Sequence, residues 1–453
     1  MTLLLIGATV VRALDPPIVE RVDLHVRDGR IAAVGPALAV DVPTLDCGGC
    51  LVIPGNVNAH AHAYSALARG MPYHLAPPTT FLEILQRVWW RLDRALDGPM
   101  IRTSALVAGR EALLAGTTTL VDHHASPNAI DGSLHVIAEA FGELGLRSVL
   151  AYEVTDRDGP ERSAAGLEEN ARFLRRCAER WYPLARGMVG AHASFTLGDE
   201  TLAACAALAG RTGTGLHVHV AEDALDEADA VARTGSRVVQ RLAAAGALDE
   251  FALLAHGVHL DPAEAELVRS AKATVAHNPR SNMSNGVGRT PLGWLGDRVA
   301  LGTDGIGGDL FEEARTAFLR RREEELGAGP DWALARLAVG PRVVGRAFAE
   351  PLLGRLAPGA PADLVVLDYA PPTALEASTL AAHWIYGLAA SAVRDVMVAG
   401  ELVVRDRRLT RVDEAELIVG ANEQAARLWA RLEAIGTHPF NPSRLLATSI
   451  GAG

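Results

Sequence analysis

Short apolar runs alternate with longer amphipathic segments rich in alanine and leucine between about residues 55 and 345. Short apolar runs are typical of buried strands, whereas apolar residues spaced three or four positions apart are typical of helices. Repeated strand–helix units over this length predict a parallel (β/α) barrel or a doubly wound sheet. The predicted strands are 118–121, 148–152, 188–192, 216–220, 252–256, 274–277 and 299–302, and the predicted helices include 134–144, 166–180, 199–212 and 262–271.

The two ends of the chain have a different pattern. Before residue 55, short β-type runs are separated by turn signals such as Arg27-Asp28-Gly29, and β-type runs return after residue 355. We therefore expect 1–54 and 355–410 to build one small β domain around a central domain at 55–354, followed by a C-terminal helix and tail at 411–453. The predicted strands of the first part are 3–6, 18–26 and 30–34, the β-type pattern returns at 362–368 and 393–404, and the last helix is predicted at 414–435.

The charge balance excludes some classes of partner. The 453 residues include 43 Lys and Arg against 54 Asp and Glu, a formal net charge of −11, so we expect no nucleic-acid partner. The apolar stretches fall short of the ~20 residues that a membrane span requires, so we expect no membrane insertion. The apolar start lacks a basic leading segment and is predicted to be a strand rather than a signal peptide. Together these features predict a cytoplasmic protein.

The four cysteines, at positions 47, 50, 177 and 205, predict no disulfide framework in a chain of this length. Cys47-Gly-Gly-Cys50 is a CxxC pair, but no second pair accompanies it and no helix pattern typical of a redox motif follows it. We interpret both cysteines as packing residues rather than as a metal or redox site.

Candidate chemistry begins with histidines placed near strand ends. His60-Ala61-His62 has two imidazoles two positions apart, which on an extended segment lie on the same side. Such a pair can bind one metal ion, although a His-x-His pair alone is also compatible with two exposed loop residues. A second pair, His217-Val218-His219, ends another predicted strand, and alternation allows either histidine to face a metal.

Further polar residues follow other predicted strands, namely Glu222, His256 and Asp304. In a parallel barrel the strand ends converge on one face, where catalytic groups collect. Three imidazoles and one carboxylate suit Zn²⁺ and leave a coordination position for water, whose pKa the metal lowers to about 7. The sequence therefore predicts a metal-dependent hydrolytic site.

These motifs together resemble the amidohydrolase superfamily, in particular its one-metal, cytosine- and guanine-deaminase-like (ATZ/TRZ-type) branch. The resemblance covers nearly the whole chain: the HxH, HxxE, AHG and GTDG motifs, and the closing stretch at 354–368. It implies a (β/α)8 TIM-type barrel with a smaller β-sandwich domain built from both chain ends. It also implies roles for single residues: His60, His62, His219 and Asp304 as metal ligands, Glu222 as proton carrier, His256 and Asp304 as catalytic partners of the attacking water, and His192 as a substrate contact.

A finer similarity links four segments, 121–127, 152–159, 276–283 and 302–306, to the SsnA-type aminohydrolases, a subgroup associated with purine breakdown. Two-metal members of the superfamily have a lysine at the end of the fourth strand, whereas here the matching strand ends at His192. The resemblance therefore implies one divalent ion, Zn²⁺ or alternatively Fe²⁺.

Other residues have competing interpretations. His123 and His124 follow a strand and are candidates for substrate contacts, as is Arg69, which is equally compatible with a solvated cation. Asn278, in an Asn-Pro pair, lines the pocket or forms a turn, and Arg280 follows it. Trp89-Trp90 favours core packing over an aromatic lid. His259 is expected beside His256, and the remaining histidines are expected to be structural or exposed: His25, His74, His135, His383 and His438.

The function expected from these features is zinc-dependent hydrolytic deamination of a nitrogen heterocycle, a purine-like or related aminated ring, with release of ammonia. This is hydrolysis of a C–N bond other than a peptide bond, on a small-molecule substrate. The alternatives on the same site are opening of a cyclic amide or amidine and triazine-type hydrolysis. A non-catalytic scaffold is a third hypothesis, and a homodimer is compatible with the sequence.

Overall fold

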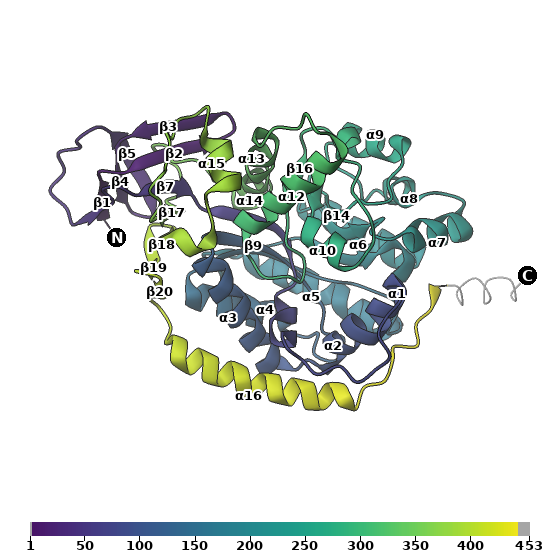
Figure 1. The fold of residues 1–453 in the computed structure, drawn as a ribbon. Helices are drawn as coiled ribbons and strands as arrows, with labels where there is room; N and C mark the ends of the chain where they lie inside the picture. The colour runs from purple at the N-terminus through teal and green to yellow at the C-terminus, as the bar shows by residue number, and fades with distance from the viewer. Residues whose placement is uncertain (1, 443–453) are drawn as a thin grey trace, which may run out of the picture.

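Eight parallel strands form the centre of the fold in the computed structural model, which describes residues 2–442 (Figure 1). They pair as two parallel sheets, and the bridges Ala61–Asp304 and Val154–Ala191 join the sheets to each other at both edges. The predicted (β/α)8 barrel is therefore confirmed. In barrel order the strands are β8 (Asn56–Ala61), β9 (Thr117–His124), β10 (Arg147–Tyr152), β12 (Val189–Ala193), β13 (Leu216–Val220), β14 (Leu253–His256), β15 (Thr274–His277) and β16 (Val299–Leu301), with the short β11 (Ala185–Gly187) beside β10.

The junction between β10 and β12 depends on a glycine. A Cβ atom on Gly190 would lie 2.2 Å from the carbonyl oxygen of Tyr152, so a larger residue would push the two strands apart. The Asn170 side chain completes the junction, because its Oδ1 accepts hydrogen bonds from the amides of Tyr152 at 2.9 Å and Gly190 at 3.3 Å. Close approach at this point allows the barrel to close.

Helices cover the outside of the barrel between successive strands (Figure 1). The strands 216–220 and 274–277 and the helix 199–212 have the predicted bounds, and most other predicted elements differ by a few residues at their ends. Two long helices, α3 and α12, were not predicted. The covering helices are α3 (Gly98–Leu114), α4 (Ser133–Leu144), α5 (Pro160–Ala178), α6 (Asp199–Thr212), α7 (Ala224–Thr234), α8 (Val238–Ala244), α9 (Pro262–Ser270), α10 (Pro279–Ser284), α11 (Leu292–Leu295), α12 (Leu310–Glu324), α13 (Asp331–Leu337), α14 (Gly340–Phe348) and α15 (Leu380–Tyr386).

The smaller domain is a β-sandwich whose two sheets share one buried core. Strands from the two parts of the chain pair directly: β7, which precedes the barrel in the sequence, runs antiparallel to β17, which follows it. The predicted single strand at 18–26 is wrong: it is broken at Val22 into β3 and β4, which belong to different sheets. The first sheet has the order β5 (Arg30–Gly35), β4 (Asp23–Arg27), β1 (Thr2–Ile6), β6 (Thr44–Asp46), and the second β20 (Arg408–Leu409), β19 (Glu401–Arg405), β18 (Val393–Val398), β17 (Leu364–Leu367), β7 (Leu51–Pro54), β2 (Thr9–Leu14), β3 (Pro17–Arg21).

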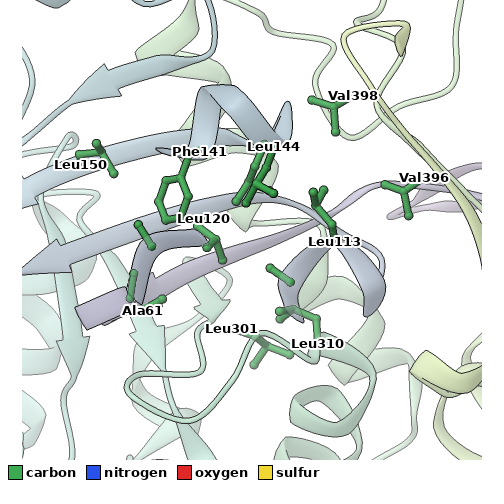
Figure 2. Close-up of a cluster of buried hydrophobic side chains, with 14 of the residues drawn as sticks. Ala61, Leu113, Leu120, Phe141, Leu144, Leu150, Leu301, Leu310, Val396 and Val398 are labelled. Carbon is green, nitrogen blue, oxygen red and sulfur yellow. The ribbon is translucent and has the colours of Figure 1, made fainter. Parts of the chain in front are cut away.

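The barrel and the sandwich share a hydrophobic core (Figure 2). Phe141 of α4 and Leu120 of β9 lie on the barrel side of this cluster, and Val396 and Val398 of β18 lie on the sandwich side, with Leu113 of α3 between them. Burial of apolar side chains contributes roughly 25 cal/mol per Å². The shared core therefore fixes the sandwich against the barrel.

A long C-terminal helix, α16 (Glu414–Glu433), packs along α3 and is followed by an extended segment (Figure 1). This segment reaches the helical stretch formed by α1 (Phe81–Ile84), a π-helical turn (Leu85–Trp89) and α2 (Trp90–Ala95). There the amide of His438 donates to the carbonyl of Gln86 at 2.9 Å, and the Gln86 side chain donates to the carbonyl of Phe440 at 2.7 Å. The predicted tail beyond residue 442 lies outside the described residues. Between residues 2 and 442, no helix is long and apolar enough to cross a membrane.

Candidate metal centre and substrate cavity

Three imidazoles and a carboxylate meet at the C-terminal ends of the barrel strands. His60 lies in β8 and His62 directly after it, His219 lies in β13, and Asp304 follows β16. Backbone hydrogen bonds fix the approach of the first and last strands, from the amide of His62 to the carbonyl of Asp304 at 3.2 Å and from the amide of Asp304 to the carbonyl of His60 at 2.9 Å. All four side chains are buried. Barrel closure thus gathers residues that are far apart in the sequence.

Two of these imidazoles are oriented by backbone carbonyls. The Nδ1 atom of His62 is 2.6 Å from the carbonyl oxygen of His123, and the Nδ1 atom of His219 is 2.8 Å from the carbonyl oxygen of His192. A carbonyl can only accept, so both Nδ1 atoms carry a hydrogen and the Nε2 atoms are the ones available to a metal. These Nε2 atoms lie 3.1 Å apart. The two side chains therefore converge through the atoms that can bind an ion.

His60 is oriented by another histidine. Its Nδ1 atom is 2.9 Å from Nε2 of His217, while its own Nε2 atom is buried with no hydrogen-bond partner. Burial lowers the pKa of His60 to about 3, so the imidazole is neutral at ordinary pH. His217 contacts His60 from below the cluster and belongs to none of the candidate ligand sets among residues 2–442. Of the pair that alternation left open, His219 is therefore the one whose donor atom lies among the candidate ligand atoms.

Asp304 completes the cluster. Its Oδ1 atom lies 2.9 Å from Nε2 of His62 and 3.3 Å from Nε2 of His60, and its Oδ2 atom accepts a hydrogen bond from Ser281. Burial alone would raise the pKa of Asp304, but its interactions with the nearby imidazoles of His60 and His62 outweigh it and lower the pKa well below its usual range. The carboxylate is therefore ionised and faces the imidazole nitrogens.

This set of donors fits a divalent zinc ion. Single donor atoms of His60, His219, His256 and Asp304 lie within 4.8 Å of one another, as do those of His60, His62, His123 and His219. Zn²⁺ in proteins is bound by imidazole nitrogen and carboxylate oxygen at about 2.0–2.2 Å, and its catalytic sites keep one position open. An unpartnered buried nitrogen on His60 would be costly without such an ion.

Glu222 and His256 lie beside the cluster. Oε2 of Glu222 is 3.6 Å from Nε2 of His256, whose Nδ1 atom is 2.8 Å from Oδ1 of Asn282. Asn285 donates to Oε1 of Glu222 at 3.3 Å. Burial raises the pKa of Glu222 to about 7, so this carboxyl is partly protonated near neutral pH and can give or take a proton.

His256 and Asp304 share an unusual backbone conformation. Their φ angles are +74° and +55°, in the left-handed region that residues other than glycine rarely adopt. Such conformations cost of order 1–3 kcal/mol and persist where the surrounding structure enforces them. Both residues are thus held at the end of their strands in positions that local propensity disfavours.

The cluster opens into a cavity with an apolar wall. Trp89 and Trp90 both line it, and both also pack in the apolar core as expected: Trp90 is fully buried, with the ring of His192 among its contacts, and Trp89 packs against the same cluster. The apolar lining is Tyr64, Phe81, Leu85, Trp89, Trp90, Ala193 and Phe195, and the polar lining is His62, Glu153, Arg157, His192, His219, Glu222, Asp223, Asp226, Asn285 and Asp304. The aromatic rings suit a flat ligand.

The predicted substrate contacts divide into two groups. His192 lines the cavity and is held by Thr196, whose Oγ1 is 2.8 Å from its Nδ1 atom. His123 is buried below the cluster with its ring stacked on that of His217, 4.3 Å between centroids, and His124 is bonded to Ser126. Neither His123 nor His124 lines the cavity.

Arg69 and Asn278 also lie away from the cavity lining. The short helix Ala63–Ala68 directs Arg69 outward, where its guanidinium pairs with Glu111 and remains largely exposed. Asn278 is buried beside Gly302, and both of its side-chain polar atoms lack a hydrogen-bond partner. Arg280 is paired with Glu312 and Glu313.

Glu153 is one of five polar lining residues that were not singled out from the sequence, the others being Arg157, Asp223, Asp226 and Asn285. Glu153 follows β10, is buried, and its Oε1 atom lies 3.2 Å from Nδ1 of His62. Burial opposes a charge on His62, but hydrogen bonds to Asp304 and Glu153 outweigh it and raise its pKa. Its position directly after a strand, like that of the other site residues, is the signal that could have identified Glu153.

The remaining candidates lie outside this site. Cys47 and Cys50 are free and buried in the sandwich, where Arg394 approaches both sulfur atoms. Burial raises the pKa of Cys47 to about 12, so it is a thiol rather than a metal-binding thiolate. His259 is bonded to the carbonyl of Val287.

Comparison with known proteins agrees with this geometry. The sequence profile of the Amidohydrolase family matches residues 51–403. A 5'-deoxyadenosine deaminase of Methanopyrus kandleri is 31% identical over 385 residues, 83% of this chain and 86% of that protein. A 5-methylthioadenosine/S-adenosylhomocysteine deaminase of Syntrophobacter fumaroxidans is 33% identical over 409 residues, 86% and 90% of the two chains. The crystal structure of an adenosine deaminase from Xanthomonas campestris with bound zinc superimposes with a TM-score of 0.80 at 25% identity, covering 94% of this chain and 98% of that one.

Proposed function

The chain belongs to the amidohydrolase family, and we propose that it is a zinc-dependent hydrolytic deaminase that removes the amino group of a purine-like ring as ammonia. The observation that carries this proposal is the placement of Glu222 and His256 beside the convergent donors of His60, His62 and Asp304, in a cavity with an aromatic wall. The relatives named as deaminases of adenine nucleosides support a substrate of this class.

His60, His62, His219 and Asp304 are the proposed ligands of one divalent ion. Zinc bound there would supply Lewis-acid activation of a water molecule for attack on the ring carbon that bears the amino group. Asp304 is ionised and can accept a proton from that water. One ion per chain is expected, because no lysine follows the strand that carries His192 to bridge a second ion.

Glu222 is the proposed proton carrier. In its protonated form it would donate to the ring nitrogen next to the carbon under attack, while His256 holds the attacking water by a hydrogen bond. Asp304 would then pass the proton that it accepted from the water to the exocyclic nitrogen, which leaves as ammonia, and Glu222 would regain its proton from the new hydroxyl group as that group becomes the carbonyl. Water and the aminated ring thus become ammonia and the ring with a carbonyl group.

The cavity wall suggests how the ring is held. Trp89 and Phe81 offer apolar surfaces, and His192 and Glu153 offer polar atoms near the cluster. We propose His192 as a substrate contact and Glu153 as a support of His62, since the latter carboxylate points to Nδ1 of that ligand. His123, His124 and Asn278 lie buried behind the cavity lining, and Arg69 lies outside it, paired with Glu111.

The experiment is an ammonia-release screen of the zinc-loaded protein over 5'-deoxyadenosine, 5'-methylthioadenosine, S-adenosylhomocysteine, adenosine, adenine and guanine. Ammonia and the ultraviolet spectrum of the ring are measured in the same sample, with Glu222→Gln as the matched control. Deamination gives one ammonia per molecule of an intact, carbonyl-bearing purine. Loss of the purine absorbance would indicate ring opening. A failure of every substrate in this screen, and of an aminated triazine tested in the same way, would favour a non-catalytic scaffold.

The setting of the enzyme is part of the proposal. A small-molecule substrate and a cytoplasmic location agree with four free cysteines among residues 2–442, because reducing compartments keep thiols unpaired. The Zn²⁺ content, against the Fe²⁺ alternative, is measured by mass spectrometry of the purified protein. Light scattering tests the homodimer.

A further inference from the structure

A second cavity, of about 550 Å³, lies at the opposite end of the barrel from the candidate metal centre. Its wall includes Met188, Thr214, Ala252 and Thr274, which lie at or just before the starts of β12, β13, β14 and β15. Three of these strands carry His192, His219 and His256 at their other ends. Pockets that bind small molecules usually have volumes of about 300–1,000 Å³, so this space is large enough for one ligand.

The cavity carries positive charge without matching carboxylates. Arg180, Arg186 and Arg346 line it, and none of them forms an ion pair with a carboxylate of residues 2–442. Arg186 donates only to backbone carbonyls, those of Tyr182 and Ala185, and Arg346 donates to the carbonyl of Glu250. In a chain with a net charge of −11, where many arginines pair with carboxylates, such a group is unusual.

Acidic groups offset only part of this charge: Glu250 and Asp249 act on Arg346, but burial and the neighbouring Arg298 outweigh them and lower its pKa. Glu250 is the acidic residue of the lining, and a fourth lining arginine, Arg175, is already paired with Glu168. Burial lowers the pKa of Arg186, and the neighbouring positive charge of Arg180 lowers it further. A bound anion would relieve this repulsion between guanidinium groups.

The remaining lining is apolar. Val149, Leu174 and Val343 contribute aliphatic surface, and the Arg186 guanidinium lies 4.5 Å from the centroid of the Phe348 ring. Guanidinium groups stack on planar rings and also bind phosphate oxygens through two parallel hydrogen bonds. The cavity therefore combines a surface for a ring with a group of donors for an anion.

We propose that this cavity binds a small aromatic phosphate, with the ring on the apolar lining and the phosphate on Arg180, Arg186 and Arg346. Inorganic phosphate would leave the apolar surface uncovered, and a neutral ring would leave the guanidinium groups without a counter-charge. The proposal is independent of the reaction at the other end of the barrel.

The test is isothermal titration calorimetry of the full-length, zinc-loaded protein with 1-naphthyl phosphate, 1-naphthol and inorganic phosphate. We expect one site for 1-naphthyl phosphate, with an affinity at least tenfold greater than for either other probe. Equal affinity for 1-naphthol and 1-naphthyl phosphate, or no binding of 1-naphthyl phosphate, would overturn the proposal.

Variants locate the binding. Arg180→Gln removes a guanidinium that makes no hydrogen bond within residues 2–442, so the fold should be kept, which a circular dichroism melt checks. Because hydrogen bonds between charged groups are among the stronger ones, we expect a loss of affinity of at least about tenfold. Arg21→Gln, an exposed arginine in the sandwich, is the matched control and should bind like the wild type. Unchanged binding by Arg180→Gln and by Arg346→Gln would place the phosphate elsewhere, the metal centre included, and overturn the proposal.

Discussion

Two segments of the barrel have the same His-x-His spacing but different surroundings. In the first, His60 and His62 both bring Nε2 to within 3.3 Å of Oδ1 of Asp304. In the second, His219 reaches the cluster, whereas His217 lies beneath it against Nδ1 of His60. The spacing is identical, yet one pair supplies two candidate ligands and the other supplies one ligand and its support.

The difference arises from depth along the strand. Residues two apart on a strand face the same side but lie about 6.6 Å apart along it. β13 pairs regularly with β14, so His217 remains one level deeper in the barrel than His219. The pairing of β8 with β9 is irregular between Asn58 and Ala61, which brings both histidines of that pair to the cluster. Alternation along a strand determines which side a residue faces, and the regularity of the strand determines how deep in the barrel that residue lies.

The largest effect is expected for the ligands themselves. His62→Ala and His219→Ala should each lose the bound ion and essentially all turnover, a loss far greater than the roughly 100-fold that a supporting residue contributes. Zinc content by mass spectrometry and the deaminase assay check this. Full zinc occupancy in His219→Ala would show that His219 is not a ligand, and His217 and His219 would then no longer differ in this role.

Glu222→Gln is expected to separate chemistry from binding. Gln keeps the shape and the contact with Asn285 but cannot carry a proton, so turnover should fall by about 10²–10⁴-fold while the ion and the substrate still bind. Calorimetry with substrate and the zinc content are measured alongside kcat. Near-normal turnover would assign the proton transfer to another residue, Asp304 or His256.

His217 should show an intermediate effect. His217→Leu removes the contact with Nδ1 of His60 and is expected to lower zinc affinity by roughly 10–100-fold, without abolishing activity at saturating zinc. The matched variant His217→Gln keeps a polar atom near the position of Nε2 and should recover part of the affinity. If His217→Leu lost the ion irreversibly, as His62→Ala is expected to, His217 would have to be a ligand.

The smallest effect is expected for the cysteine pair. Cys47→Ser with Cys50→Ser should retain the ion and the turnover of the wild type, because both thiols lie in the sandwich core, away from the cluster. Zinc content and kcat are the measurements. Loss of zinc in this double variant would identify a second site that the barrel histidines do not explain.

The sequence could predict the site residues that lie at the ends of predicted parallel strands. His60, His219, His256 and Asp304 were identified because parallel strands end on one face, and the structure brings these residues together. Glu153 obeys the same rule and was overlooked. Arg69 was selected for its closeness in sequence to His62, but a short helix between them turns its side chain outward.

Other features of the structure could not be predicted from any short stretch of the sequence. The helices α3 and α12 were not predicted because small and charged residues interrupt their apolar spacing, and tertiary packing stabilises them instead. The contact between the two histidine pairs joins residues 157 positions apart. The cavity wall likewise combines Phe81 with Phe195, whose proximity depends on barrel closure rather than on any sequence pattern.

The segment that holds Phe440 against Trp90 has a consequence for synthesis of the protein. Every proposed zinc ligand precedes residue 305, and the helices that pack on β8 and β16 end with α14 at Phe348, so the barrel and its ligands are synthesised well before the C-terminal segment. The aromatic wall, by contrast, awaits the residues that fasten Gln86, 354 positions earlier in the chain. A chain that ends before His438 would therefore fold as a barrel and bind zinc, but it would bind the ring of the substrate weakly. The zinc site and the substrate-binding wall would therefore be completed at different stages of synthesis of the chain.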